Sequence, residues 1–161
     1  MKMNGFVTFV IAGVVACSSL AYAQTDTEKE VERAVVDRWE HRNTTLKSQP
    51  EGASEHGTLA FWSSGGLLQE EKGLDSSLEF DVHNVQVKHI KVITLVEGQA
   101  AVAHYYLEGT MKAKGESLVS HYLVRATMAF VSEDGKWKRR AGHFSPIAGG
   151  SGISSAVPEN K

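Results

Sequence analysis

A succession of β-branched and aromatic runs, separated by short polar turns, constrains the fold of this chain more than any other feature. The runs are TLAFW (58–62), VQVKHIKVITLV (85–96), AAVAHYYLEG (100–109) and LVSHYLVRATMAFV (118–131). Glu133-Asp134-Gly135 has the composition of a tight hairpin turn, and it leads into a last strand from Lys136 to about Phe144. Consecutive strands joined by short turns predict an antiparallel, meander-like sheet.

The segment before these strands has the pattern of one long amphipathic helix, from Thr25 to about Leu46. Thr25 or Asp26 can cap its N-terminus, and glutamates fill the first turns. The apolar residues that recur at steps of three and four are Val31, Ala34, Val35, Trp39 and Leu46. One helix packed on the sheet predicts the α+β class.

Residues 1–23 have the features of a secretory signal peptide. Lys2 supplies a positive charge, residues 6–16 form an apolar run, and Ala21-Tyr22-Ala23 is an A-x-A cleavage site before Gln24. The apolar run is too short to span a bilayer. We therefore expect a secreted or periplasmic protein that begins at Gln24.

A second interpretation of the leader stays open. Val14-Val15-Ala16-Cys17 resembles the bacterial lipobox, which would make Cys17 a lipidated N-terminus and the protein a lipoprotein. A membrane is an expected partner only in that case. Cys17 is the only cysteine, so a chain cut after Ala23 has no disulfide and no catalytic thiol.

Composition excludes several other classes. The net charge is −2, and the basic run Lys136, Lys138, Arg139 and Arg140 is interpreted as a solvated strand edge, so we expect no nucleic-acid partner. Seven histidines occur without H-E-x-x-H, a His pair at ligand spacing or a cysteine in the mature chain, so no metal is expected. No cofactor is expected either.

The chain divides into three parts by composition. After the signal peptide at 1–23, one domain is predicted over 24–147. Residues 148–161 (AGGSGISSAVPENK) are rich in Gly and Ser and poor in bulky apolar residues. We predict a flexible C-terminal tail there.

Three short motifs then point to a known family. An R-x-T pattern is present as Arg125-Ala126-Thr127, a D-G-x-W hairpin as residues 134–137, and an H-x-S ending of the last strand as His143-Phe144-Ser145. Together with the element order, they resemble the NTF2-like superfamily, and most closely its SnoaL-like and DUF4440-type branches and the calmodulin-dependent kinase II association domain. The resemblance implies a cystatin-like cone, with a long N-terminal helix packed on a curved, mainly antiparallel sheet.

The alternation of side chains in the last strand predicts its role. Trp137, Arg139, His143 and Ser145 fall on one face when side chains alternate without interruption. In the resembling family the Trp face is concave and lines the pocket. The resemblance thus implies that His143 points into the cone near its mouth, as a ligand-contacting or proton-transferring group, with Trp137 structural.

Neighbouring strands supply further candidates for the pocket wall. Tyr106 shares a face with Val102, His104 and Glu108, whereas Arg125 shares a face with His121, Leu123 and Thr127. The register between these strands stays open. Phe61 is expected to pack in the core and Trp62 to line the pocket. The predicted ligand-binding residues are His143, Ser145, Arg125, Tyr106, His121 and Trp62; no catalytic residue is assigned.

The resemblance leaves two functions open, because the fold hosts isomerases, cyclases, dehydratases and assembly domains. The first is an exported protein whose cone-shaped pocket binds a small, largely apolar molecule, with an isomerase- or cyclase-like activity as an extension. The second is a non-catalytic module that dimerises through the outer face of its sheet. A homodimer is expected in either case.

Overall fold

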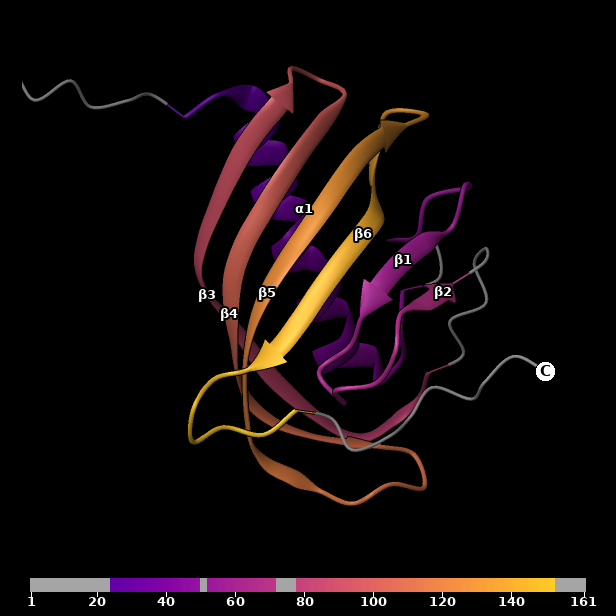
Figure 1. The fold of residues 1–161 in the computed structure, drawn as a ribbon, viewed down its shortest axis with the longest axis vertical. Coiled ribbons are helices and arrows are strands. Elements are labelled where there is room, and N and C mark those ends of the chain that lie inside the picture. The colour runs from indigo at the N-terminus through magenta and orange to yellow at the C-terminus, as the bar shows by residue number, and fades with distance from the viewer. Residues whose placement is uncertain (1–23, 50–51, 72–77, 153–161) are drawn as a thin grey trace, which may run out of the picture.

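The computed structural model describes residues 24–49, 52–71 and 78–152. It contains one helix, α1 (Asp26–Thr45), on one side of a sheet with strand order β2-β1-β6-β5-β4-β3 (Figure 1). The strands are β1 (Thr58–Phe61), β2 (Gln69–Glu71), β3 (Phe80–Val96), β4 (Ala100–Ala113), β5 (Val119–Glu133) and β6 (Lys136–Pro146). The predicted α+β class is confirmed. The strands β3 to β6 form the predicted antiparallel meander, and β1 adds to β6 in parallel.

The ends of α1 follow from local hydrogen bonding. The Thr25 hydroxyl accepts from the Glu28 backbone N–H, and the Glu28 carboxylate accepts from the Thr25 N–H, which is a capping box. At the other end Leu46 adopts a left-handed conformation, and its N–H donates to the Arg42 carbonyl at 3.0 Å. The helix lies where the sequence predicts it. Its buried residues are Thr27, Val31, Val35, Arg38, Trp39 and Arg42.

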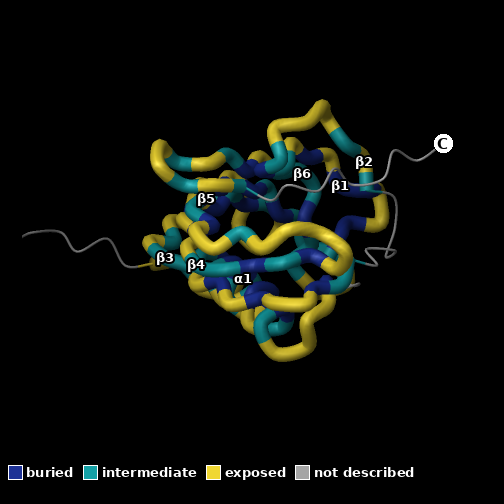
Figure 2. The backbone as a smooth tube through the Cα atoms, turned by 90° about the horizontal axis from the view of Figure 1, so that it is seen from below, coloured by how far each residue is buried: buried dark blue, intermediate teal, exposed yellow. Residues whose placement is uncertain are grey.

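Every second residue is buried over 101–107 of β4 and 122–130 of β5, and the residues between them are half-buried or exposed. Figure 2 colours the backbone by this burial. The buried residues of both strands pack with those of α1 in one core. We call the buried side the inner face of the sheet and the exposed side the outer face. The core between helix and sheet is apolar over most of its volume. Its central members are Val31, Val35, Trp39, Val85, Leu107, Val124, Met128 and Phe144.

A β-bulge at Arg140 interrupts the alternation in β6. Phe130 of β5 lies opposite Arg139, and the next β5 partner, Ala129, lies opposite Ala141, so Arg140 is an extra residue. Beyond the bulge the two faces of β6 exchange. Arg139 and Phe144 are therefore buried on the inner face, at 2% and 3% exposure. The prediction that Trp137, His143 and Ser145 share one face is wrong for this reason.

Two other expectations need correction. Arg139, predicted to lie on a solvated edge, is among the most buried side chains of the sheet. Residues 148–152, predicted as part of a flexible tail, lie beside β5, where the Ser151 N–H donates to the His121 carbonyl at 3.0 Å and the Leu123 N–H donates to the Ser151 carbonyl at 3.2 Å. The signal peptide at 1–23 and the rest of the tail at 153–161 lie outside the described residues.

Among the described residues, no helix is long and apolar enough to cross a membrane.

The close approach of β3 and β4 depends on Gly109. Its φ is +156°, and a Cβ at this position would lie 2.0 Å from the Asn84 carbonyl oxygen and 2.9 Å from Val85 Cα, both backbone atoms of β3. A register shift between Gly109 and Met111 marks the same point in the pairing of β4 with β5. Only glycine fits here without displacing a neighbouring strand.

We expect Gly109→Ala to lower the free energy of unfolding by more than about 2 kcal/mol, because the new methyl group displaces the β3 backbone. Urea denaturation measures the change. Gly98→Ala and Gly115→Ala are matched controls, since both glycines have positive φ (68° and 82°) with nothing within 4 Å of the added Cβ. These controls should cost only about 1 kcal/mol. Equal losses at all three positions would contradict the steric argument.

Candidate functional site

Most of the predicted ligand-binding residues lie together on the outer face, and the bulge adds His143 and Ser145 of β6 to that face. Tyr106 of β4 lies opposite Arg125 of β5, which lies opposite Ser145 of β6. The Arg125 Nε–H donates to the Ser145 hydroxyl at 2.8 Å. The shared faces predicted for these strands are confirmed, and the open register is settled, because His104 pairs with Thr127. The row faces away from α1.

The two predicted histidines lie on the same outer face. The ring of His143 packs edge-on against Phe61 of β1, with 5.7 Å between ring centroids. His121 is exposed on β5. The prediction that His143 points into the cone is therefore wrong, as is the core position expected for Phe61, which is 46% exposed. A ligand-binding role for these outer residues stays a prediction.

Trp62 is the predicted site residue that lies on the inner face. Its ring stacks on Phe144 with centroids 5.1 Å apart and an interplanar angle of 19°. The buried indole Nε1 has no hydrogen-bond partner among the described residues. Trp62 thus presents a polar donor and a flat apolar surface to the interior.

Three arginines occupy the inner face, and sequence reasoning did not select any of them. Arg38 and Arg42 lie one turn apart on α1, and Arg139 lies across from them on β6. Their exposures are 5%, 8% and 2%. Buried guanidinium groups are costly unless they are paired, so the partners of each one decide what this site can do.

Arg139 is fully engaged in structural contacts. Its Nη1 donates to the Glu71 carboxylate of β2 at 3.2 Å, and its Nε donates to the Gly52 carbonyl at 3.2 Å. Its own backbone carbonyl accepts from the Ser54 N–H at 2.9 Å. Arg139 therefore ties β6 to the segment before β1 and to β2.

Arg38 and Arg42 differ from Arg139 because they lack such partners. All three side-chain nitrogens of Arg38 are buried without a hydrogen-bond partner among residues 24–49, 52–71 and 78–152, and the same holds for Arg42 Nε. The Arg42 guanidinium lies over the Trp39 ring at 5.0 Å from its centroid, a cation–π contact. Among the described residues, Glu71 is the carboxylate that acts on Arg38 and Arg42, so the described part of this cluster has more positive than negative charge.

The electrostatic consequence is visible in the pKa values of these arginines. Burial, followed by the charges of Arg139 and Arg42, lowers the pKa of Arg38 well below its ordinary value. Burial and the charge of Arg139 lower the pKa of Arg42 to about 10. Both shifts express the free-energy cost of holding positive charge in this interior. A bound anion would reduce that cost.

A pocket of about 300 Å³ opens onto this cluster between α1 and β6. Arg38 and Arg139 line it together with Trp137, whose indole N–H donates to Glu30 of α1 at 3.0 Å. The other lining residues are Ala34, Asp37, Gln49, Gly52, Phe130, Lys136 and Lys138. Arg38 is thus a buried cation at the wall of a pocket, with no hydrogen-bond partner in the part of the chain that the structure describes.

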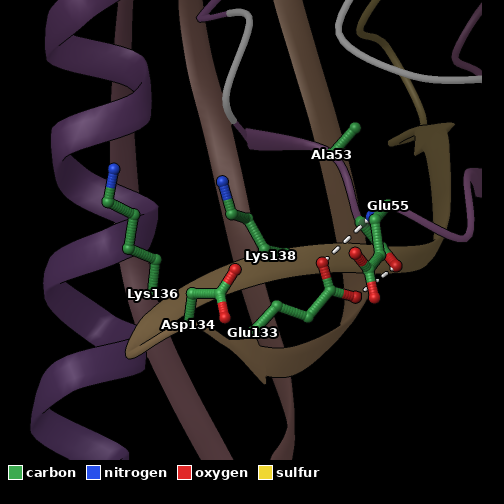
Figure 3. Close-up of a pocket in the computed structure, with 7 residues that line it drawn as sticks. Ala53, Glu55, Glu133, Asp134, Lys136 and Lys138 are labelled. Atoms are coloured by element: carbon green, nitrogen blue, oxygen red, sulfur yellow. Dashed lines mark hydrogen bonds between the residues drawn. The ribbon is translucent and has the colours of Figure 1, made fainter.

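A second pocket of about 250 Å³ lies at the β5–β6 hairpin. Figure 3 shows its residues, with Glu133 reaching toward the segment that carries Ala53 and Glu55. The Glu133 carboxylate accepts from the Ser54 hydroxyl and from the Glu55 N–H at 3.0 Å. The polar contacts of this pocket fasten the hairpin to the segment before β1, which is a structural role.

His83 of β3 lies at the far end of the arginine cluster. Its ring stacks on Trp39 with centroids 5.8 Å apart and meets Phe80 edge-on at 4.6 Å. Nδ1 lies 2.6 Å from Asn43 Oδ1, whereas the buried Nε2 has no hydrogen-bond partner in the described part of the chain. Burial, followed by the charge of Arg42, lowers the pKa of His83 to about 3. The imidazole is therefore neutral at physiological pH.

Two buried tyrosines complete the inner wall. Burial raises the pKa of Tyr105, and it raises the pKa of Tyr122 to about 12. Both phenols are thus neutral and available as hydrogen-bond donors. Within the described residues no group of three or more His, Cys, Asp or Glu side chains could hold a metal ion.

One sequence signal could have revealed the arginines of α1. Positions 31, 35, 38 and 42 continue the same helical stripe at steps of four, three and four, and the last two are Arg38 and Arg42. Arginine on the apolar stripe of a helix is either paired or functional. No sequence pattern indicates that Arg38 is left without a partner.

Comparison with known proteins supports the fold. No protein-family model and no curated protein matches the sequence. A proposed aromatic ring hydroxylase from Novosphingobium aromaticivorans has a similar structure, with a TM-score of 0.59 at 16% identity, over 78% of this chain and 92% of that one. An NTF2-like protein of unknown function from Prochlorococcus marinus gives 0.53 at 19% identity, over 82% and 97%.

A third similar structure is a proposed calmodulin-dependent kinase II association domain from Xanthomonas campestris, with a TM-score of 0.52 at 18% identity, over 78% of this chain and 93% of that one. The chain therefore has the NTF2-like fold, which confirms the recognition made from the sequence motifs. At these identities the likeness concerns the fold alone.

The low pKa of His83 predicts a pH dependence of stability. In the unfolded chain the pKa of His is about 6.5, so between about pH 3 and that value the unfolded state binds more protons. The contribution of His83 to stability is therefore complete above the unfolded pKa and is lost as the pH falls. The slope approaches about 1.4 kcal/mol per pH unit for this single group.

Urea denaturation between pH 7 and pH 5, above the main carboxylate titration, measures this slope. We expect His83→Gln to flatten the profile relative to the wild type, because the variant has no group to titrate at this position. His143→Gln is the matched control on the exposed outer face and should keep the wild-type slope. An unchanged slope in His83→Gln would show that the buried imidazole does not set the pH dependence.

Proposed function

We propose that the inner face of this NTF2-like fold binds a small organic anion, with Arg38 as the residue that recognises the negative charge. The observation that carries the proposal is Arg38, a residue 5% exposed that lines the pocket between α1 and β6 and whose three side-chain nitrogens are buried without a hydrogen-bond partner among the described residues. Burying a cation in this way is unfavourable unless an anion joins it. A carboxylate can accept two parallel hydrogen bonds from one guanidinium group.

The rest of the interior suits the uncharged part of such a ligand. Phe130 and Trp137 line the same pocket as Arg38 and provide aromatic surface there. Aromatic side chains bind flat, apolar groups by stacking and edge contacts. The proposed ligand is therefore a small apolar or aromatic molecule with one negative charge. This refines the largely apolar ligand that the sequence predicts.

Export is part of the proposal and is supported by the leader pattern of residues 1–23. An exported protein with such a site would capture its ligand outside the cytoplasm. The NTF2-like neighbours include a proposed aromatic ring hydroxylase and an association domain, so the fold is compatible with binding, with catalysis and with assembly. The charge of Arg38 supports binding.

Replacement of Arg38 tests the proposal. We expect Arg38→Met to reduce the affinity for benzoate, used as an aromatic carboxylate probe, by at least about 30-fold, because a buried charge pair is lost. The same variant should be more stable than the wild type by about 1–4 kcal/mol without ligand, because an unpaired buried charge is replaced by an apolar side chain of similar length. Isothermal titration calorimetry and urea denaturation measure the two effects.

Two controls make the result specific. Arg33→Met removes a charge from an exposed position of the same helix and should leave both affinity and stability near the wild type. Benzamide, the neutral analogue of benzoate, should bind much more weakly to the wild type. If Arg38→Met binds benzoate normally and is less stable than the wild type, Arg38 is a structural residue and the proposal fails.

The outer face supports a second candidate function, which is self-association. The large side chains exposed on this face include Phe61 at 46%, Tyr106 at 44% and Ile93 at 52%. They project from β1, β4 and β3, so the exposed apolar surface spans the sheet. Exposed apolar groups spread over a sheet face favour contact with a second protein surface. We infer that two copies of this chain pack through their outer faces.

We expect the wild-type protein to be a dimer in light scattering after size-exclusion chromatography, and Tyr106→Glu to shift it to the monomer. The reason is that a carboxylate buried between two sheets remains without a partner. Leu67→Glu is the matched control, because Leu67 is 87% exposed and lies in the segment between β1 and β2. A monomeric wild type at micromolar concentration would refute the self-association.

A further inference from the structure

We propose that His83 is the proton acceptor of the anion site, and that its Nε2 takes up one proton from solvent when an anion binds and then donates a hydrogen bond to that anion. The inference rests on the proposed function, because it requires an anion next to Arg42. It adds a second recognition group, which lies beside Arg42 rather than in the wall of the pocket that Arg38 lines. It also makes the affinity dependent on pH.

The hydrogen bonds of Asn43 determine which imidazole nitrogen is free. Asn43 Nδ2 donates to the Val85 carbonyl at 2.9 Å, and Asn43 Oδ1 accepts from the Val85 N–H at 3.0 Å. These two bonds fix the orientation of the amide, so the atom that faces His83 Nδ1 at 2.6 Å is an acceptor. Nδ1 must therefore carry the hydrogen. In the neutral ring, Nε2 is left with a lone pair.

The lone pair of Nε2 is buried, and no described residue donates to it. A buried acceptor without a donor is costly and uncommon in folded proteins. The imidazole itself is held rigidly, because Trp39 stacks on one side and Phe80 meets it edge-on. A fixed ring with one unsatisfied nitrogen is preorganised to interact with something that enters the interior.

Arg42 couples this nitrogen to the anion. Its guanidinium lies over the same two rings, at 5.0 Å from the Trp39 centroid and 5.9 Å from that of Phe80. Burial, and after it the charge of Arg42, disfavours a positive charge on His83. An anion that accepts hydrogen bonds from Arg42 cancels this repulsion and supplies an acceptor for a protonated Nε2. Binding and protonation therefore favour each other.

The other groups that face His83 do not couple anion binding to its protonation. On β4 its cross-strand partner is Met111, and on β3 its ring neighbour is Phe80, neither of which titrates. On α1 the facing groups are Trp39, Asn43 and Arg42. Tyr105 of β4 and Tyr122 of β5 act on Arg42 and are neutral phenols. Arg42 is thus the charged group through which ligand binding reaches His83.

Calorimetric titration of the full mature chain with benzoate, in two buffers of different ionisation enthalpy, measures the number of protons taken up. In the wild type we expect between a half and one proton per bound benzoate at about pH 5.5, and an affinity that rises as the pH falls from 7 to 5.5. His83→Gln should still bind benzoate, about 10-fold more weakly, with no proton uptake. His143→Gln, on the outer face, should behave as the wild type.

The outcomes separate the two proposals. Benzoate binding by the wild type without proton uptake, or uptake that persists in His83→Gln, overturns the role of His83 and leaves the anion site intact. If benzoate binding is lost in Arg38→Met but the affinity of the wild type does not depend on pH, the role of His83 is likewise overturned and the anion site remains. Failure of the wild type to bind benzoate at any pH between 5.5 and 7 overturns both proposals. His83→Phe, which keeps the ring packing, provides a second variant if His83→Gln does not fold.

Discussion

The buried side chain of Arg139 joins three segments that are distant in sequence, and the geometry of the site depends on it. Its guanidinium donates to the Gly52 carbonyl and to the Glu71 carboxylate, and its backbone carbonyl accepts from Thr58 Oγ1 at 2.8 Å. These contacts hold β1 and β2 against β6. Gly52 and Arg139 line the pocket that Arg38 also lines. The position of this pocket wall therefore depends on Arg139, whose charge is paired with that of Glu71. The burial of that charge is tolerated because several polar contacts replace water.

Arg38 lies in the same interior, but its side chain makes no hydrogen bond to the described residues. Glu71 pairs with Arg139. The positive charges of Arg38 and Arg42 on α1 therefore repel each other, and both residues carry the free-energy cost of burial. Burial is the main reason why His83 is neutral, and the charge of Arg42 adds to it. The inner face is thus positively charged and largely desolvated. Such an environment strengthens the attraction for an anion, because water screens the interaction weakly there.

Local sequence signals predicted the helix and the strands of this fold. They did not predict which face of β6 each side chain lies on beyond Arg140, the extra residue of the bulge. The capping box at Thr25 and the turn at Asp134-Gly135 depend only on neighbouring residues, so the helix and the last hairpin were predictable. The bulge at Arg140 depends on how β6 pairs with β5, and no local pattern indicates it. It moves His143 to the outer face and so separates it from Arg139, which stays on the inner face. The missing partner of Arg38 could not be predicted either, because pairing in the interior is a tertiary property.

The bulge also gives the two faces of β6 different residues, which suits the proposed anion site on the inner face and the proposed self-association through the outer face. Before the bulge, the inner face of β6 supplies Trp137 and Arg139 to the pocket, and after it the outer face receives His143 and Ser145 beside Arg125. Because the two faces are separated by the sheet itself, a dimer formed on the outer face would leave the mouth between α1 and β6 open. In natural proteins buried charges are usually paired. Exceptions to this rule occur mainly where function requires them. Arg38 is such an exception among the described residues, where Arg42 Nε and His83 Nε2 are also buried without a hydrogen-bond partner. In the proposed site, the Trp39 ring, whose centroid lies 5.9 Å from the Arg38 guanidinium, favours an aromatic anion over an inorganic one.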